Sequence, residues 1–437
     1  MGAYEEWDTL EDIVRKEENS TKVLLVGLDT GEEPEFEHSM EELASLAEAA
    51  GKTVVGIITQ RLQSVNKALY IGPGKLEEAK EYAQECGAEE VIFDNTLTPS
   101  QVRNLGRELE LPVLDRTNLI LDIFALRART KEAKLQVETA RLQYILPRLV
   151  GMRENLSRQG GTGGSMSNKG AGETKLELDR RRIEHRISEL RRELEAVART
   201  RDTMRKKRSD SEVPQVALVG YTNAGKSTLL NRMVELYGEG QEKTVLQKDM
   251  LFATLDTSVR RIHTGDNRPF FLADTVGFIH KLPHGLVKAF RSTLEEVCHA
   301  DLLIQVVDYS DEHYKEQMKV TSETLKELGA GDIPQIIVYN KADLCKGQLL
   351  PYMHGHQIYM SAAQGIGLNE LIQMIKETVY ADRENACFLI PYDKGNVASI
   401  LMENATVLAQ EYRTEGVWLQ VSCNKNDGAR YNAYRCG

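Results

Sequence analysis

A chain of 437 residues is too long for one ordinary hydrophobic core, and its length predicts two to four domains. Hydrophobic residues make up 41% of it, no run of about 18 apolar residues predicts a transmembrane helix, and its acidic start lacks the apolar segment of a signal peptide. The six cysteines form no C-x-x-C pair, which argues against a zinc site or a disulfide framework and favours a reducing cytoplasm.

The charge is distributed unevenly along the chain. The net charge of −11 argues at first against a nucleic-acid partner, but residues 127–208 hold 22 Lys and Arg against 11 Asp and Glu. One basic segment inside an acidic protein predicts a localised anionic partner, with RNA the leading candidate. The alternative is a solvated helical surface whose charges bind nothing specific.

Short apolar runs alternate with helical patterns over roughly the first 115 residues. Amphipathic stretches such as Ser39–Gly51 and Lys75–Gly87 end in glycine, which is a helix-stop signal. This alternation predicts a small parallel α/β sheet. The predicted strands are Lys22–Leu28, Thr53–Thr59, Glu90–Asn95 and Leu111–Asp115.

The basic segment contains two helical patterns on either side of a loop rich in glycine, Arg158–Glu173. Apolar residues of the second pattern recur in steps of four and three, as in a heptad seam. The segment is therefore predicted to form an antiparallel helical hairpin with a basic exterior. The alternative role is a packed helical pair that holds neighbouring domains together. The seam residues are Ile183, Ile187, Leu190, Leu194 and Val197.

The stretch "GYTNAGKST" fits the pattern G-x-x-x-x-G-K-[ST] and lies between an apolar strand and a helical pattern, where a P-loop belongs. Glycines let the backbone N–H groups approach phosphate oxygens, and the following helix directs its positive end at the same phosphates. Lys226 can bridge the β- and γ-phosphates, and Ser227 can offer its hydroxyl to Mg²⁺. The predicted nucleotide-binding residues here are Gly220, Tyr221, Thr222, Asn223, Ala224, Gly225, Lys226, Ser227 and Thr228.

Three downstream motifs complete a GTP site. Asp274 of "DTVG" can hold a magnesium-bound water, and Thr254 of "FATLD" can ligate Mg²⁺ while the γ-phosphate is present. Asp343 of "NKAD" can accept hydrogen bonds from guanine, whereas adenine would be repelled. All motifs in this order predict GTP and GDP binding. The further binding residues are Phe252, Ala253, Thr254, Leu255, Asp256, Asp274, Thr275, Val276, Gly277, Asn340, Lys341, Ala342, Asp343, Ser361, Ala362 and Ala363.

The residue after "DTVG" is Phe278, where the best-known GTPases place a glutamine that orients the attacking water. A phenyl ring makes no conventional hydrogen bond to water, so weak hydrolysis by the isolated protein is predicted. The residues expected to take part in catalysis are Thr254, Gly277 and Asn223, and the metal ligands are expected to be Ser227, Thr254 and Asp274.

A polar break at Ser209–Pro214 predicts a domain boundary. Beyond roughly residue 383 the tail carries a helical pattern at Asn396–Tyr412 and a strand-like Gly416–Cys423, which fits a small α+β domain. The sequence thus predicts a multidomain α/β protein with a P-loop GTPase domain built on a doubly wound sheet. The predicted parts are an N-terminal α/β domain at 1–126, the hairpin at 127–210, the GTPase domain at 211–383 and the C-terminal domain at 384–437.

Together these segments resemble the HflX family of ribosome-associated GTPases, in the translation-factor-related class. The resemblance implies binding to the large ribosomal subunit, ribosome-stimulated GTP hydrolysis and, in characterised members, separation of stalled ribosomes. An apolar residue in the glutamine position is also a family feature. The matching stretches are Tyr70–Glu78, Asp115–Leu149, Leu156–Ile183, Gly220–Asn231, Phe252–Asp256 and Asp274–Ile279.

Other interpretations stay open at this point. Asn223 resembles the P-loop asparagine of potassium-stimulated GTPases, where K⁺ stabilises developing charge; the alternative is that its side chain only hydrogen-bonds within its own loop. Some family members are reported to use ATP through the region of "GPGK", Gly72–Lys75, which could equally be a turn and a helix start. Instead of RNA, the coiled coil could bind a protein partner in a signalling switch, or the N-terminal domain could drive ATP-dependent RNA remodelling. A monomer without membrane attachment is expected.

Overall fold

A computed structural model of the chain describes residues 20–31, 35–149, 168–209, 213–238, 252, 258–266, 268–281, 296–345, 347, 349–423 and 425–436. The chain forms two compact units. The first unit consists of residues 1–200 together with 250–252 and 280–290, and the second contains the rest. Within the described ranges, none of the helices combines the length and apolar character needed to cross a lipid bilayer.

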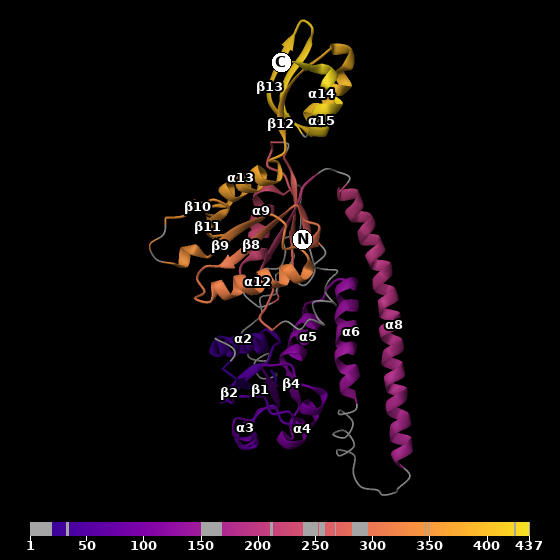
Figure 1. Ribbon diagram of the computed structural model, residues 1–437, viewed down its shortest axis with the longest axis vertical. Helices are drawn as coiled ribbons and strands as arrows, with labels where there is room; N and C mark the ends of the chain where they lie inside the picture. The colour runs from indigo at the N-terminus through magenta and orange to yellow at the C-terminus, as the bar shows by residue number, and fades with distance from the viewer. Residues whose placement is uncertain are drawn as a thin grey trace, which may run out of the picture. The chain divides into compact units, whose positions relative to one another are not determined.

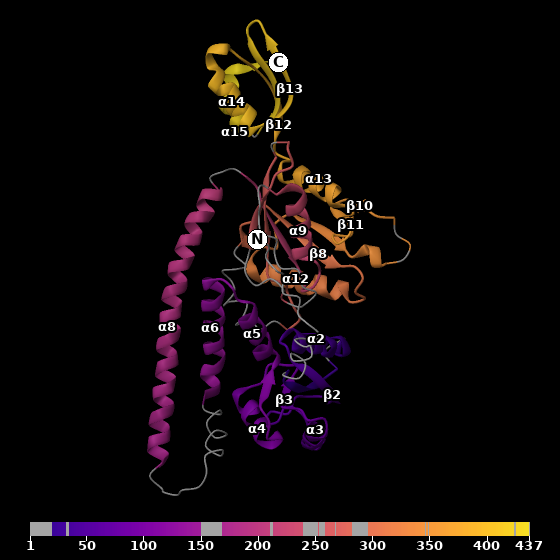
Figure 2. The ribbon, with the colours of Figure 1, turned by 180° about the vertical axis from the view of Figure 1, so that it is seen from behind.

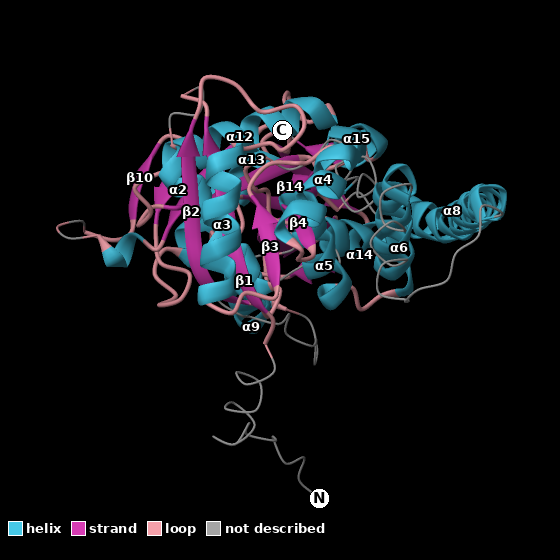
Figure 3. Ribbon diagram, turned by 90° about the horizontal axis from the view of Figure 1, so that it is seen from below, coloured by secondary structure: helices cyan, strands magenta, loops and turns pink. Residues whose placement is uncertain are grey.

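The first unit is built on a four-stranded parallel sheet in the order β2-β1-β3-β4, which confirms the small parallel sheet predicted from the sequence. Six consecutive residues of β1 are buried, because a parallel sheet is covered by helices on both faces. Helices α2 and α5 pack together on one face, and α3 and α4 cover the other, as Figure 3 shows from below. The strands are β1 (Lys22–Asp29), β2 (Thr53–Arg61), β3 (Glu90–Phe93) and β4 (Val113–Asp115), and the helices are α2 (Phe36–Ala49), α3 (Pro73–Glu85), α4 (Pro99–Leu109) and α5 (Arg116–Arg127).

A buried cluster of charges lies at the carboxyl end of β3. Asp94 is fully buried, and its Oδ1 accepts from Nη1 of Arg116 at 2.7 Å. The second arm of that guanidinium pairs with Glu42, which is also buried. Lys281 donates to Asp94 as well, so two acidic and two basic side chains balance one another. Removing one member of such a cluster would leave an uncompensated buried charge, which typically costs about 3–5 kcal/mol.

Phe252 also belongs to the first unit. Its ring packs in a T-shaped arrangement with that of Phe124 on α5, with ring centroids 4.8 Å apart and planes at 84°. Both side chains are almost fully buried. The first unit therefore includes the buried ring of Phe252 and the partly buried Lys281, which come from beyond its N-terminal 200 residues.

The basic segment forms two antiparallel helices, as the sequence predicts. These are α6 (Lys131–Ile145), followed by a 3-10 turn (Leu146–Arg148), and α8 (Asn168–Ser209). Lys131 near the start of α6 pairs with Glu193, and Glu138, seven residues later, pairs with Arg186, seven residues earlier on α8. The two helices therefore run in opposite directions. Figures 1 and 2 show the two helices side by side from opposite directions. In the predicted seam, Ile187 and Leu190 are buried.

One boundary of the hairpin differs from the prediction. The glycine-rich loop was expected to run to Glu173, but α8 begins at Asn168 and includes Gly170 and Gly172 in its first turns. Each glycine costs a helix about 1 kcal/mol relative to alanine. A helix of 42 residues tolerates this cost because extending an existing helix is cooperative. The part of the predicted loop from 158 to 167 lies outside the described residues.

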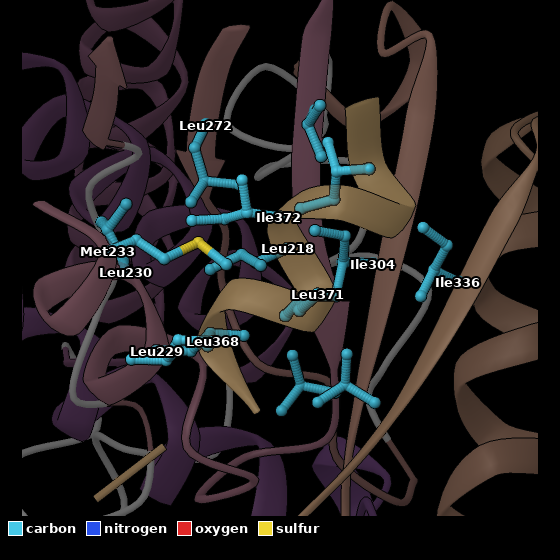
Figure 4. Close-up of a cluster of buried hydrophobic side chains, with 14 of the residues drawn as sticks. Leu218, Leu229, Leu230, Met233, Leu272, Ile304, Ile336, Leu368, Leu371 and Ile372 are labelled. Carbon is cyan, nitrogen blue, oxygen red and sulfur yellow. The ribbon is translucent and has the colours of Figure 1, made fainter. Parts of the chain in front are cut away.

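The second unit contains a seven-stranded sheet in the order β10-β11-β9-β8-β5-β7-β6. Strands β11, β9, β8, β5 and β7 are parallel, and the two edge strands are antiparallel to their neighbours. Apolar residues from α9 and α13 pack against one face, as Figure 4 shows for Met233, Leu371 and Ile304. The elements are β5 (Gln215–Gly220), α9 (Lys226–Tyr237), β6 (Ser258–Ile262), β7 (Phe270–Asp274), β8 (Leu302–Asp308), α12 (Tyr314–Leu328), β9 (Gln335–Asn340), β10 (Tyr352–His354), β11 (Gln357–Tyr359) and α13 (Leu368–Val379).

The chain ends in a four-stranded antiparallel sheet in the order β13-β14-β12-β15 with two helices, which is the βαββαβ arrangement. The prediction of one helix over Asn396–Tyr412 is wrong, because the helix ends at Asn404 and Thr406–Arg413 is a strand. This segment pairs with β14 across a tight hairpin, and sheet pairing overrides its helical periodicity. The elements are β12 (Glu384–Ile390), α14 (Gly395–Asn404), β13 (Thr406–Arg413), β14 (Gly416–Cys423), α15 (Lys425–Arg430) and β15 (Arg435–Cys436).

Candidate functional site

The predicted nucleotide-binding motifs meet at one edge of the seven-stranded sheet. The P-loop follows β5, "DTVG" begins at the end of β7, "NKAD" begins at the end of β9, and Ser361–Ala363 follow β11. These four strands are parallel, so their carboxyl ends share an edge. Strand β5 lies between β7 and β8, where the chain changes direction across the sheet, and such switch points are where open α/β sheets bind ligands.

Two P-loop glycines are required by the backbone. Gly220 has φ +144°, and a Cβ there would lie 2.2 Å from the carbonyl oxygen of Val306 on the neighbouring strand. Gly225 has φ +95°, and a Cβ there would lie 2.2 Å from Nδ2 of Asn340. Both positions therefore exclude any larger residue, and the loop stays close to the strand end and to the base-recognition motif.

Lys226 is buried at the start of α9. Its Nζ donates to the carbonyl oxygens of Gly220 at 3.0 Å and Tyr221 at 2.6 Å. Burial lowers the pKa of this ammonium to about 8, against the opposing effect of the Asp274 carboxylate. A negatively charged phosphate beside Nζ would restore the favourable environment of the charged form.

Ser227 and Asp274 offer the oxygen donors that Mg²⁺ prefers. The Ser227 hydroxyl donates to Oδ2 of Asp274 at 2.7 Å, which brings one hydroxyl and one carboxylate together beside Lys226. Mg²⁺ binds through a few such hard oxygen ligands and keeps several waters. The residues present therefore fit this ion. Thr254, the third predicted metal ligand, lies outside the described residues, as do Ala253, Leu255 and Asp256.

The "DTVG" segment is hydrogen-bonded to the P-loop through the backbone of Phe278. The Phe278 N–H donates to the Gly220 carbonyl at 3.1 Å, and the Thr222 N–H donates to the Phe278 carbonyl at 2.8 Å. The ring of Phe278 is buried, and the hydroxyl of Thr275 donates to the carbonyl of Leu218 at 2.6 Å. The segment is therefore anchored on both sides of Gly277, and Phe278 directs no polar group toward a nucleotide.

The base-recognition motifs are joined to the P-loop by one buried amide. Nδ2 of Asn340 donates to the carbonyl of Ala224 at 2.9 Å, and its Oδ1 accepts from the N–H of Ala362 at 2.9 Å. Asp343 lies just beyond, and its Oδ2 accepts from Nε2 of Gln364 at 2.8 Å. Of the remaining predicted binding residues, Ser361 is buried and Asn223 is exposed with φ +61°.

Sequence reasoning missed three supporting residues. Asp308, at the end of β8, accepts from Lys341 of "NKAD" at 2.6 Å. Gln364 bonds Asp343, and Arg232 of α9 donates to the carbonyl of Ala363 at 3.0 Å. The apolar run of β8 ending in an aspartate was a usable signal for Asp308. The partners of Gln364 and Arg232 are distant in sequence, and no local pattern indicated them.

Comparison with known proteins assigns the family. Residues 37–125 match the N-terminal region and residues 127–208 the middle region of GTP-binding GTPases, and residues 215–341 match a 50S ribosome-binding GTPase family. A GTPase HflX from Caldanaerobacter subterraneus subsp. tengcongensis is 43% identical over 97% of this chain and 95% of that relative. The GTPase HflX of Escherichia coli K12 is 40% identical over 82% of this chain and 83% of that relative. The chain belongs to the HflX family of GTPases.

A crystal structure of a GTP-binding protein from Sulfolobus solfataricus in complex with GDP is also similar. It is 27% identical, with 83% of this chain and 99% of that chain covered and a TM-score of 0.42. As an HflX-family member with a P-loop GTPase domain, the chain binds guanine nucleotide and hydrolyses GTP to GDP and phosphate. The family expected from the sequence is thus confirmed.

The pKa of Lys226 predicts how nucleotide affinity depends on pH. Below about pH 8 the ammonium is charged and ready for phosphate, but above that pH the nucleotide-free protein must take up a proton to bind. Affinity for GDP should therefore be level near pH 7 and fall toward pH 9, by up to about tenfold per unit. The buried charge also destabilises the nucleotide-free fold below about pH 8, a cost that fades as the pH rises. Titration calorimetry across this range measures the affinity.

The matched control is Lys226→Arg, whose guanidinium stays protonated throughout. The fall in GDP affinity toward pH 9 should therefore be absent from this variant, whatever its absolute affinity for GDP. Equal pH dependence in the two proteins would show that another group titrates.

Proposed function

We propose that the chain is a GTP-operated switch that binds the large ribosomal subunit and helps to split or rescue stalled ribosomes in the cytoplasm. In this proposal the hairpin at 127–210 contacts ribosomal RNA, and the GTPase domain at 211–383 senses the nucleotide. The domains at 1–126 and 384–437 flank them. The observation that carries the proposal is the exposed basic face of α8 in a chain whose GTPase domain matches a 50S ribosome-binding family.

The charges of α8 divide into two sets. Several arginines are paired with acidic neighbours, as Arg180 is with Glu184 and Arg181 with Glu177. Arg191 and Arg192 are exposed and have no ion-pair partner among the described residues. Adjacent guanidinium groups that are not neutralised locally suit phosphate oxygens, because each can form two parallel hydrogen bonds to a phosphate.

In the proposed switch, Lys226 and the P-loop N–H groups hold the phosphates, and the Gly277 N–H meets the γ-phosphate. Ser227, Asp274 and Thr254 would hold Mg²⁺. When bound, this ion neutralises charge on the β- and γ-phosphates. Asp343 would accept two hydrogen bonds from guanine, with Gln364 orienting its carboxylate. A γ-phosphate contact to both "FATLD" and "DTVG" would make the shape of these segments depend on the nucleotide.

Replacing Asp343 by Asn tests the assignment of the base reader. The amide presents a donor where guanine also presents a donor, so affinity for GTP should fall about 10- to 100-fold, as expected for lost bonds to a charged group. Xanthosine triphosphate, which carries an oxygen in place of the 2-amino group, should gain relative affinity. Competition binding with GTP, XTP and ATP measures both effects. Asp332→Asn, on an exposed loop of the same domain, is the control and should change neither. An unchanged GTP-to-XTP ratio in Asp343→Asn would contradict the assignment.

Sedimentation with purified large subunits tests the proposed partner. Binding should be tightest with a non-hydrolysable GTP analogue and weaker with GDP or without nucleotide. It should also weaken steeply as salt rises, because phosphate contacts release counterions. The double change Arg191→Ala and Arg192→Ala should reduce the slope of log affinity against log salt by about 2.

The matched control removes two positive charges elsewhere, with Lys319→Ala and Lys326→Ala on α12, both exposed. This variant should bind as the wild type does. Binding that ignores salt and survives the arginine changes would favour an apolar protein partner for the coiled coil. Absence of binding in every nucleotide state would overturn the ribosomal proposal.

A third experiment concerns the activator of hydrolysis. Since Phe278 is buried and apolar, we propose that the bound ribosome, or K⁺ held near Asn223, supplies the missing stabilisation. Turnover should be slow for the isolated protein in Na⁺ and rise with large subunits, with K⁺, or with both. GTP hydrolysis measured in the four combinations separates the two sources. Equally fast rates in all four would refute both.

A further inference from the structure

Thr222 is one of the predicted nucleotide-binding residues, and its side-chain hydroxyl is a buried polar group in the P-loop. The residue is 6% exposed, and its Oγ1 has no hydrogen-bond partner among the residues that the structure describes. A buried hydroxyl without a partner is unfavourable, because it has lost its hydrogen bonds to water and gained none in the protein. Such a group in a catalytic loop suggests a ligand that completes its bonding.

The side chain lies against the two groups that face the γ-phosphate. A Cβ placed on Gly277 would lie 2.9 Å from both Cα and Cγ2 of Thr222 and 3.0 Å from Nζ of Lys226. Thr222 and Lys226 therefore both lie against Gly277, and the methyl group of Thr222 faces it. Rotation about the Cα–Cβ bond of Thr222 exchanges its methyl and hydroxyl groups, so the hydroxyl can reach the side where the γ-phosphate and the attacking water meet.

The backbone fixes this side chain in relation to the position of the missing glutamine. The Thr222 N–H donates to the carbonyl of Phe278 at 2.8 Å, and Tyr221 and Phe278 form a parallel bridge. Tyr221 thus lies opposite Phe278, and Thr222 is the next residue of the P-loop in the short stretch where the two segments pair. A hydroxyl offers one donor and two acceptor positions, so like the amide of a glutamine it can both accept from a water and donate to a phosphate.

We propose that Thr222 is a catalytic residue for GTP hydrolysis, whose hydroxyl contacts the γ-phosphate and the attacking water in place of the glutamine. The water oxygen bonds to the γ-phosphorus, the bond to the β–γ bridging oxygen breaks, and the water proton passes to the departing phosphate. Thr222 begins and ends protonated, and it acts only by orienting the water and bonding the phosphoryl oxygen. A valine could not do this, although its shape is nearly the same.

The experiment compares Thr222→Val, which removes the hydroxyl, with Thr222→Ser, which keeps it and removes the methyl group. Single-turnover GTP hydrolysis is measured for each isolated protein, together with its affinity for GDP. Loss of the hydrolytic hydrogen bond should slow Thr222→Val by about tenfold or more, while GDP, which lacks the γ-phosphate, binds within about twofold of the wild type. Thr222→Ser should stay within about threefold of the wild-type rate.

Three outcomes would overturn the proposal. A wild-type rate in Thr222→Val would show that the hydroxyl takes no part. Equal losses of GDP affinity and hydrolysis in Thr222→Val would assign the residue to the shape of the loop. A rate in Thr222→Ser as low as that of Thr222→Val would place the effect in the methyl group.

Discussion

The side chain of Asn340 holds the nucleotide site together. The P-loop and the two base-recognition segments come from parts of the chain more than a hundred residues apart, and strand β8 lies between β5 and β9, which lead into the P-loop and "NKAD". One buried amide spans the gap by donating to Ala224 and accepting from Ala362. A buried amide bonded at both ends favours one geometry strongly, because each lost bond would leave a desolvated polar group. The distance between the phosphate-binding and guanine-binding ends of the pocket follows from this contact.

A second constraint acts on the phosphate side. The backbone of Phe278 is bonded to residues 220 and 222, so "DTVG" cannot move at its C-terminal end without breaking two hydrogen bonds to the P-loop. Burial of the phenyl ring adds apolar stabilisation of about 1.5–3 kcal/mol. An apolar residue at this position therefore has a structural use that a glutamine reaching toward water would not have. Among the described residues, the P-loop side chains of Lys226 and Thr222 lie beside Gly277.

Local patterns predicted most of the core elements well. The four parallel strands of the first unit and the P-loop strand were found because their apolar runs are short and are followed by clear turn or helix signals. The errors arise where distant parts of the chain decide. Residues 406–413 have helical spacing but pair as a strand with β14. The pairs Lys341–Asp308 and Gln364–Asp343 join separate loops, so their partners could not be read from neighbouring residues.

The composition of the first unit bears on any attempt to study it in isolation. Asp94 and Glu42 are balanced by Arg116 from the N-terminal segment and by Lys281, which follows "DTVG" in the chain. A fragment that stopped near residue 210 would keep both carboxylates but only one of the two cations, and Phe124 would lose its contact with the ring of Phe252. The fragment would keep one uncompensated negative charge at a buried position, and the ring of Phe124 would become more exposed to water. Ligand affinities or melting temperatures obtained from such a piece would thus describe an altered electrostatic environment at the carboxyl end of β3.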